Sequence, residues 1–267
     1  MLAGLSSLSA MNFYGLMQTE EGYNRQREIF ETQPTVERAK DRFLEKALNA
    51  RSVEEFVDDF EVRQYLTQAY GLEGDLAASP AFIKQVLTED LGKEDALVYR
   101  LNDQRFLKMA SDLRLDQGLE NIQDPLTIAF VNDKYETVGL EQAVGNENLA
   151  VREALYFKRT IGEVETPFQI LADNPLRAVV FGVLGIPAEV AYQGVDKQAE
   201  AITDRIDIED FQDPEYVENF ISRYLITADS QTDQTGGMAS LIQPLSLNGS
   251  GSLSDPVIYS LDVNLLV

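Results

Sequence analysis

The 267-residue sequence contains no cysteine, no histidine and no tryptophan. Without histidine, a Ser-His-Asp triad and a histidine general base are excluded. Without cysteine, a thiol nucleophile, a disulfide and a Cys/His zinc site are excluded as well. Asp, Glu, Ser, Thr, Tyr, Lys and Arg are left for catalysis, and a metal site could be built only from carboxylates.

Basic side chains are also scarce, because 22 Lys and Arg face 45 Asp and Glu, which gives a net charge of −23. Nucleic-acid binding relies on a Lys/Arg footprint, so this balance argues against a nucleic-acid partner. It argues equally against an anionic membrane surface. A basic protein partner, or simple solubility, fits better. The length predicts one large or two small domains.

Long apolar runs are missing too. The most apolar internal stretch, 178–192, is interrupted by Pro187 and Glu189 and is shorter than the roughly 20 residues that a bilayer requires. The first cationic side chain is Arg25, so the start of the chain lacks the basic region of a secretory signal. We expect no membrane insertion, and no secretory signal peptide is evident.

Apolar residues instead recur at helical spacing, as in the stripe that contains Val36, Phe43 and Ala47. Five residues that can cap a helix stand directly before proline, where helices often begin: Ser79, Asp124, Thr166, Asn174 and Asp213. We therefore predict an all-α fold. With boundaries uncertain by about 2–4 residues, the expected helices span 10–31, 35–50, 52–58, 60–70, 80–90, 93–100, 103–114, 124–144, 147–162, 166–172, 175–185, 188–205 and 213–227.

An internal duplication is predicted, because residues 52–72 align without a gap on 166–186. Identical aligned pairs include Asp59 with Asp173, Arg63 with Arg177, and Gly71 with Gly185. Each glycine follows an apolar helix, so we expect both in the left-handed conformation that ends a helix. Unrelated amphipathic helices that resemble one another are the alternative. The side chains expected in the core are Phe43, Phe56, Leu66, Leu72, Phe157, Leu171, Val180 and Ile186.

The predicted organisation is an N-terminal helical segment (1–34), a first helical half (35–115), a connecting helix region (116–150), a second helical half (151–228) and a flexible tail with an apolar terminal arm (229–267). The tail is predicted because 229–256 is rich in Ser, Gly, Gln, Asp and Thr. The arm either docks on its own chain or adds to a partner. Its candidate interaction residues are Val257, Ile258, Tyr259, Leu261 and Val263.

Two clusters of acidic residues are candidate cation sites. The first, Glu54, Glu55, Asp58 and Asp59, is better explained as acids that complement the dipole at a helix start. The second, Asp204 to Asp213, lacks the spacing of an EF-hand loop. The chain also lacks a phosphate-binding glycine motif. We therefore assign no catalytic residue, no cofactor or cofactor-binding residue, and no metal ligand, although paired carboxylates for glycoside hydrolysis stay open.

An ordered series of short motifs runs along the chain: Ser52 to Asp59, Ala69 to Leu72, Phe82 to Leu87, Arg100 to Phe106, Asn174 to Arg177, Leu184 to Pro187, Phe211 to Glu215 and Arg223 to Leu225. This series resembles the domain-of-unknown-function 1217 family over about residues 10–228. No single motif is specific. Tyr70 stands where that family usually has Phe, and Phe106 stands where it usually has Tyr. The resemblance implies a helical fold and, because the family is alphaproteobacterial and often encoded among flagellar genes, a motility context. It implies no activity.

We expect a non-enzymatic interaction or assembly protein associated with the bacterial flagellum or motility system. Its partners are expected to be proteins, either basic or flagellar, and its location either the cytoplasm or the flagellum. One alternative is a carboxylate-based enzyme that acts on cell-wall glycan, and another is a secreted flagellar structural subunit. A cleft that holds two facing carboxylates with raised pKa is the feature that favours the enzyme.

Overall fold

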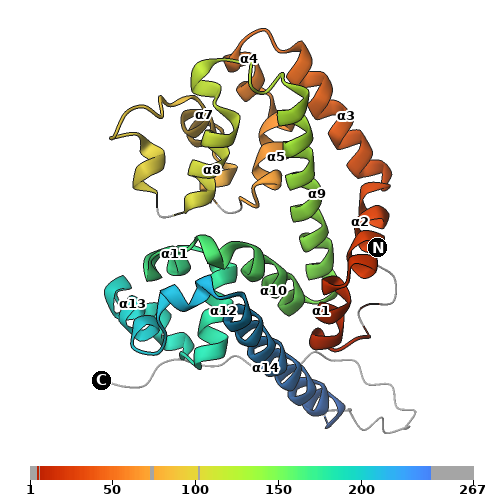
Figure 1. Ribbon diagram of the computed structural model, residues 1–267, viewed down its shortest axis with the longest axis vertical. Helices are drawn as coiled ribbons and strands as arrows, with labels where there is room; N and C mark the ends of the chain where they lie inside the picture. Colours follow the sequence, from red (N-terminus) through yellow and green to blue (C-terminus); the bar gives the residue numbers. More distant parts are fainter. Residues whose placement is uncertain (1–4, 6, 73–74, 102, 242–267) are drawn as a thin grey trace, which may run out of the picture. The chain divides into compact units, whose positions relative to one another are not determined.

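Helices are the only regular elements in the part of the chain that the structure describes, which confirms the predicted all-α fold (Figure 1). The structure is a computed structural model that describes residues 5, 7–72, 75–101 and 103–241. Residues 1–231 form one unit and 232–267 a second. None of the helices within the described ranges combines the length and the apolar character needed to span a bilayer.

The elements of the first part of the chain are α1 (Ala10–Gln18), α2 (Glu20–Glu31), α3 (Pro34–Asn49), α4 (Val53–Asp58), α5 (Phe60–Ala69), α6 (Asp75–Ala78), α7 (Pro80–Thr88), the 3-10 helix η1 (Leu97–Arg100), α8 (Gln104–Leu113) and η2 (Leu115–Gln117). They are followed by α9 (Pro125–Glu147), α10 (Leu149–Thr160), η3 (Ile161–Glu163), α11 (Pro167–Ala172), α12 (Asn174–Leu184), η4 (Ala188–Tyr192), α13 (Val195–Thr203), η5 (Ile208–Gln212) and α14 (Pro214–Leu241).

Three expected helices are divided or shortened in the structure. The segment 10–31 forms two helices, because the side chain of Thr19 accepts a hydrogen bond from Gly22 N at 3.1 Å and starts α2 there. The segment 93–100 holds only the short η1, and 188–205 is divided between η4 and α13. In the segment 10–31, a helical spacing of apolar residues continues across the break between α1 and α2.

The helix α14 continues to Leu241, past the expected helix end at 227 and past residue 229, where the tail is predicted to begin. The carboxylate of Asp229 accepts hydrogen bonds from Ala10 N at 2.7 Å and Met11 N at 3.3 Å, so it caps the N-terminus of α1. Asp229 lies in a polar segment, and its contact with α1 could not be predicted from that composition. The rest of the predicted tail, 242–267, lies outside the described residues.

All eight side chains predicted to form the core are buried. The helix α9 connects the two halves, since it packs against α5 of the first half and α10 of the second (Figure 1). It also packs against α2 of the N-terminal segment. In the first half, Tyr65 stacks between Phe43 and Tyr135, with ring centroids 4.3 and 4.1 Å apart. In the second half, Phe157 packs edge-on against Phe211 at 5.5 Å. Each half thus has its own aromatic cluster.

The ends of α5 and α12 have the same geometry. Gly71 has φ +65° and Gly185 has φ +60°, which confirms the predicted left-handed conformation. After each glycine an aliphatic residue donates its N–H to the carbonyl five residues before it: Leu72 N lies 2.8 Å from Thr67 O, and Ile186 N lies 3.0 Å from Phe181 O. This is the Schellman pattern of a helix C-terminus.

The starts of α5 and α12 match as well. Asp59 accepts hydrogen bonds from the first turn of α5, and Asp173 accepts one from the first turn of α12. Arg63 Nη1 donates to the carbonyl of Val57 at 2.7 Å, and Arg177 Nη1 donates to the carbonyl of Leu171 at 3.3 Å. These recurrences are what a duplication produces, and the duplication itself stays a prediction that a superposition of 36–72 on 151–186 tests.

Candidate functional site

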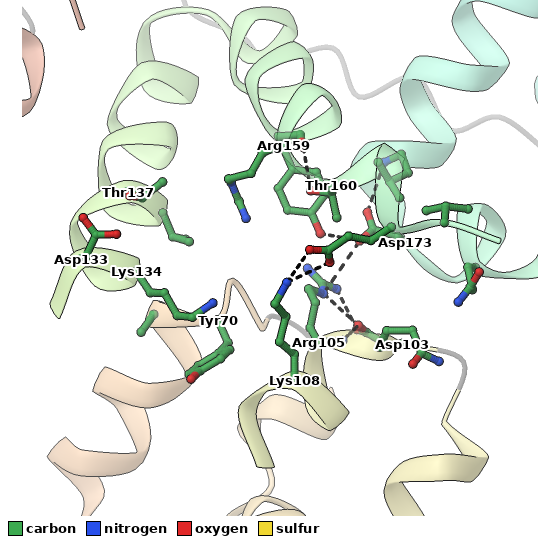
Figure 2. Close-up of a pocket in the computed structure, with 18 of the residues that line it drawn as sticks. Tyr70, Asp103, Arg105, Lys108, Asp133, Lys134, Thr137, Arg159, Thr160 and Asp173 are labelled. Carbon is green, nitrogen blue, oxygen red and sulfur yellow. Dashed lines mark hydrogen bonds and ion pairs between the residues drawn. The ribbon is translucent and has the colours of Figure 1, made fainter. Parts of the chain in front are cut away.

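A pocket of about 280 Å³ lies where helices of both halves meet α9 (Figure 2). Its walls come from the C-terminal end of α5, from α8 and α9, and from α10, η3, α11 and the start of α12. The site therefore exists only when the two halves are packed together. Clefts between packed helices are common positions for ligand sites in helical proteins.

Four cationic side chains line this pocket, although the whole chain carries a net charge of −23. Arg105 and Lys108 come from α8, Lys134 from α9 and Arg159 from α10. Figure 2 shows the charged ends of Lys108, Lys134 and Arg159 directed toward one central space. The same lining holds four carboxylates, so recognition of a negative group depends on a cation that these carboxylates leave incompletely paired.

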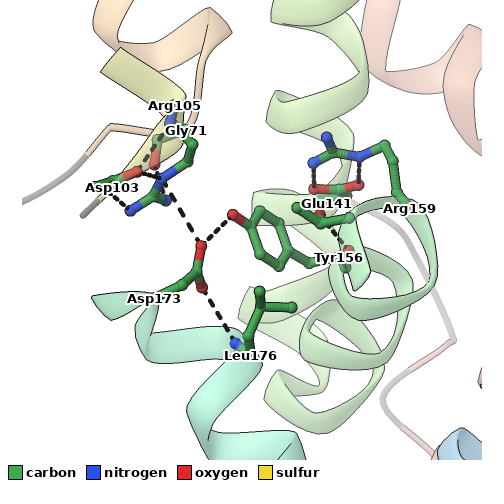
Figure 3. Close-up of polar contacts among 9 residues, drawn as sticks. Gly71, Asp103, Arg105, Glu141, Tyr156, Arg159, Asp173 and Leu176 are labelled. Atoms are coloured by element: carbon green, nitrogen blue, oxygen red, sulfur yellow. Dashed lines mark hydrogen bonds and ion pairs between the residues drawn. The ribbon is translucent and has the colours of Figure 1, made fainter. Parts of the chain in front are cut away.

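Asp173 organises one wall of the pocket (Figure 3). The residue is only 7% exposed, and its side chain accepts hydrogen bonds from the Tyr156 hydroxyl at 2.6 Å and from Leu176 N at 3.1 Å. The Nε atom of Arg105 lies 3.8 Å from the same carboxylate. Burial, followed by the charge of Asp173, raises the pKa of Tyr156, so this hydroxyl stays a hydrogen-bond donor.

Arg105 joins this wall to the first half of the chain (Figure 3). Its guanidinium donates to both carboxylate oxygens of Asp103, at 2.9 and 2.8 Å, and to the carbonyl of Gly71 at 2.7 Å. The left-handed turn at Gly71 exposes this carbonyl to the arginine at the end of α5. A single guanidinium therefore ties the C-terminus of α5 and the N-terminus of α8 to Asp173 of the second half.

Lys134 differs from the other cations, because its one ion pair among the described residues is long. Its Nζ lies 3.6 Å from Oδ2 of Asp112, beyond normal hydrogen-bond distance. The same ammonium lies 4.9 Å from the ring centroid of Tyr70 and 4.7 Å from that of Phe130. Burial lowers the pKa of Lys134, which means that its surroundings compensate the charge only in part.

The acidic side chains of the pocket each have a partner: Asp103 pairs with Arg105, Asp133 with Arg27, Glu163 with Lys108, and Asp173 accepts from Tyr156. Arg159 is held by Glu141 through two hydrogen bonds of 2.8 and 2.9 Å (Figure 3). Carboxylates fixed in this way act as acceptors that orient cations. The pocket therefore supplies groups for binding, with the cations in fixed positions.

The residues singled out by sequence have other positions. The candidate arm, Val257, Ile258, Tyr259, Leu261 and Val263, lies outside the described residues. Of the acidic groups, Glu54 and Asp58 bind Lys84, while Asp207 and Asp213 cap η5 and α14. No set of three or more acidic side chains arranged to hold a metal ion occurs within the described ranges.

Sequence reasoning missed the pocket. It treated charge as a total for the chain, whereas the four cations are separated by up to 54 positions and converge only through packing (159 − 105 = 54). It also expected Asn174 to cap the helix before Pro175, but the cap is Asp173. A usable signal was present, since Asp173 aligns with Asp59, which caps the equivalent helix.

Comparisons with protein families and with solved structures each find a similar protein or family. A family model described as a protein of unknown function (DUF1217) matches residues 69–217, a range that contains every residue of the pocket. A crystal structure of a protein from Agrobacterium tumefaciens, determined by a structural-genomics consortium, is similar to this chain with a TM-score of 0.71 and 31% identity, and the match covers 86% of this chain and 96% of that one. Comparison with curated proteins gives no match.

Proposed function

This chain belongs to the DUF1217 family, and we propose that it is a non-enzymatic interaction or assembly protein of a bacterial flagellar or motility system. The observation that carries the proposal is the pocket between the two halves, which offers fixed cations and paired carboxylates for recognition. A partner that enters this pocket contacts α8, α9 and α10 together. It therefore senses, or stabilises, the packing of one half on the other.

The motility context rests on the resemblance to the family, because members of that family are often encoded among flagellar genes. The relative from Agrobacterium tumefaciens, an alphaproteobacterium, supports the same bacterial setting. Protein partners, basic or flagellar, belong to this proposal. A basic partner fits the acidic surface outside the pocket through long-range attraction, which raises association rates at low ionic strength.

The rival function, a carboxylate enzyme acting on cell-wall glycan, needs an acid with a raised pKa opposite a second carboxylate. Burial does raise the pKa of Glu153, but this carboxylate is bound to the Tyr224 hydroxyl outside the pocket. Inside the pocket, the acids accept hydrogen bonds from cations and from Tyr156. This arrangement favours binding over glycan cleavage.

Site-specific photocrosslinking in the motile host tests the proposal. Phe130 lines the pocket and is 45% exposed, so a benzoylphenylalanine there reaches a bound partner. Tyr192 on η4, which is 90% exposed and outside the pocket, is the matched control position. We expect an adduct with an identified flagellar component from position 130 and a weaker one, or none, from 192.

Several outcomes contradict this function. Adducts that are the same from both positions, or that contain no flagellar protein, argue against the pocket as the contact site. Release of soluble sugars from purified peptidoglycan by the wild-type protein supports the enzyme instead. Recovery of the chain in sheared flagellar filaments supports a secreted structural subunit.

A further inference from the structure

The two halves carry pockets at equivalent positions of the alignment that pairs residue n with n + 114 (166 − 52 = 114). The pocket of the first half has a volume of about 180 Å³ and is lined by eight residues. Seven of their eight counterparts line the larger pocket between the halves, the exception being Ile170, the counterpart of Phe56. The larger pocket is therefore the second-half version of a cleft that both halves possess.

Two substitutions distinguish these pockets. In the first half, the Lys46 ammonium closes the cleft, because it binds Asp59 and lies 3.3 Å from Glu61. In the second half, Thr160 stands where Lys46 would be, and its short side chain bonds to a carbonyl of its own helix. Space that a lysine fills in the first half is thus left open in the second.

The preceding position reverses charge, because Arg159 stands where the first half has Glu45. Glu141 holds this guanidinium through Nε and Nη2, so its Nη1 takes no part in the pair and its plane is fixed. The packing of α8 and α9 then adds Lys108 and Lys134 to the same space (Figure 2). The second-half cleft is enlarged, and it holds four cations beside four carboxylates that already have partners.

Lys134 is the group that this space leaves incompletely paired. Its ammonium lies over the Tyr70 and Phe130 rings and 3.6 Å from Asp112, while Lys108 and Arg159 each have a carboxylate at 2.7 to 2.9 Å. An anion placed at Lys134 gains a charge-assisted hydrogen bond in a partly desolvated site. The rings beside it offer a flat apolar surface.

We infer that the pocket between the halves binds a small organic anion, with a carboxylate or phosphate group on Lys134 and Arg159 and a flat apolar body against Phe130 and Tyr70. The volume of about 280 Å³ is close to the lower end of the range of small-molecule pockets, about 300–1,000 Å³, so it suits a small ligand. The inference goes beyond the interaction function and stands without it, because a free ligand is detected on the purified chain with no partner protein present.

Calorimetric titration of the full chain tests the inference with phenyl phosphate and benzoate as probes. Benzamide and benzylamine are the neutral and cationic controls, and inorganic phosphate tests the apolar body. We expect a Kd of about 1 mM or tighter for an aromatic anion and roughly tenfold weaker binding of inorganic phosphate. No saturation by either aromatic anion up to about 10 mM overturns the inference, and equal affinity for inorganic phosphate overturns the assignment of an organic ligand.

Three variants locate the site. Lys134→Gln should weaken binding about 10- to 100-fold, the loss typical of a charge-assisted hydrogen bond. Lys197→Gln makes the same charge change at an exposed position of α13 outside the pocket and should leave affinity unchanged. Equal affinities of these two variants contradict the site.

Thr160→Lys gives the second half the lysine that closes the first. It adds a positive charge but fills the space, so binding of phenyl phosphate should fall by tenfold or more. Tighter binding by this variant shows non-specific attraction to charge and overturns the inference. A circular-dichroism melt of each variant checks that the helices are intact, and Lys134→Arg, which keeps a cation, should retain binding.

Discussion

Removing the Asp173 carboxylate tests whether the wall of the pocket is built as described. Asp173→Ala deletes the cap of α12, which costs about 1 kcal/mol. It also leaves the Tyr156 hydroxyl without its acceptor in a buried position, which costs about 1–3 kcal/mol more. Arg105 keeps Asp103 and adds little to the loss. We expect the free energy of unfolding to fall by about 2–4 kcal/mol.

The matched control is Asp59→Ala, which removes the equivalent cap from α5. Asp59 also pairs with Lys46, but both side chains are about one-third exposed, and exposed ion pairs contribute only about 0–1 kcal/mol. The expected loss is therefore about 1–2 kcal/mol. Urea unfolding followed by circular dichroism at 25 °C measures both values. Equal losses from the two variants mean that the buried Tyr156 hydroxyl does not depend on Asp173.

A double-mutant cycle isolates the hydrogen bond between Tyr156 and Asp173. Tyr156→Phe removes the hydroxyl. This substitution should therefore destabilise the Asp173→Ala variant less than it destabilises wild type, with a coupling energy of about 1–2 kcal/mol. Strict additivity of the two single losses means that this hydrogen bond contributes nothing to stability.

Three further predictions concern stability. Phe43→Ala removes a buried ring that stacks in the first-half aromatic cluster and should cost about 3–5 kcal/mol in urea unfolding; a parental midpoint contradicts the core assignment. Gly185→Ala places a Cβ at φ +60° and should cost about 1–2 kcal/mol, whereas Gly15→Ala within α1 should stabilise by up to about 1 kcal/mol; equal melting temperatures contradict this. Lys134→Met should stabilise by about 0.5–1 kcal/mol at pH 7. The pKa of Lys134 is lower in the folded chain than in the unfolded chain, so wild type gains stability relative to Lys134→Met as the pH rises from the folded-state pKa toward the ordinary 10.5. A difference in stability that does not change with pH contradicts the lowered pKa of Lys134.

Much of the fold follows from local patterns. The apolar spacing around Phe43 and the glycines at 71 and 185 predicted helices, core positions and helix ends, because these depend on neighbours within a few residues. The break at Thr19 and the extension of α14 were missed. The break lies inside a continuous apolar pattern, and the extension is anchored by Asp229, whose partners are more than 200 positions away.

The candidate site was much less predictable. Arg105, Lys134 and Arg159 belong to three different helices, so their convergence depends on how α8 and α10 pack against α9. No short motif records that packing. The one sequence signal that bears on the site is the alignment of the halves, which pairs Lys46 with Thr160 when it is extended upstream of residue 52 at the same offset of 114. It indicates a difference between the two clefts but becomes interpretable only when their volumes are known.

A crystal structure of the full chain grown with phenyl phosphate tests most directly that the pocket between the halves is a binding site. We expect phosphate density within hydrogen-bond distance of Lys134 Nζ and a phenyl ring against Phe130. A pocket that contains only water while saturation is reached in solution, or phenyl phosphate bound only outside the pocket, contradicts it.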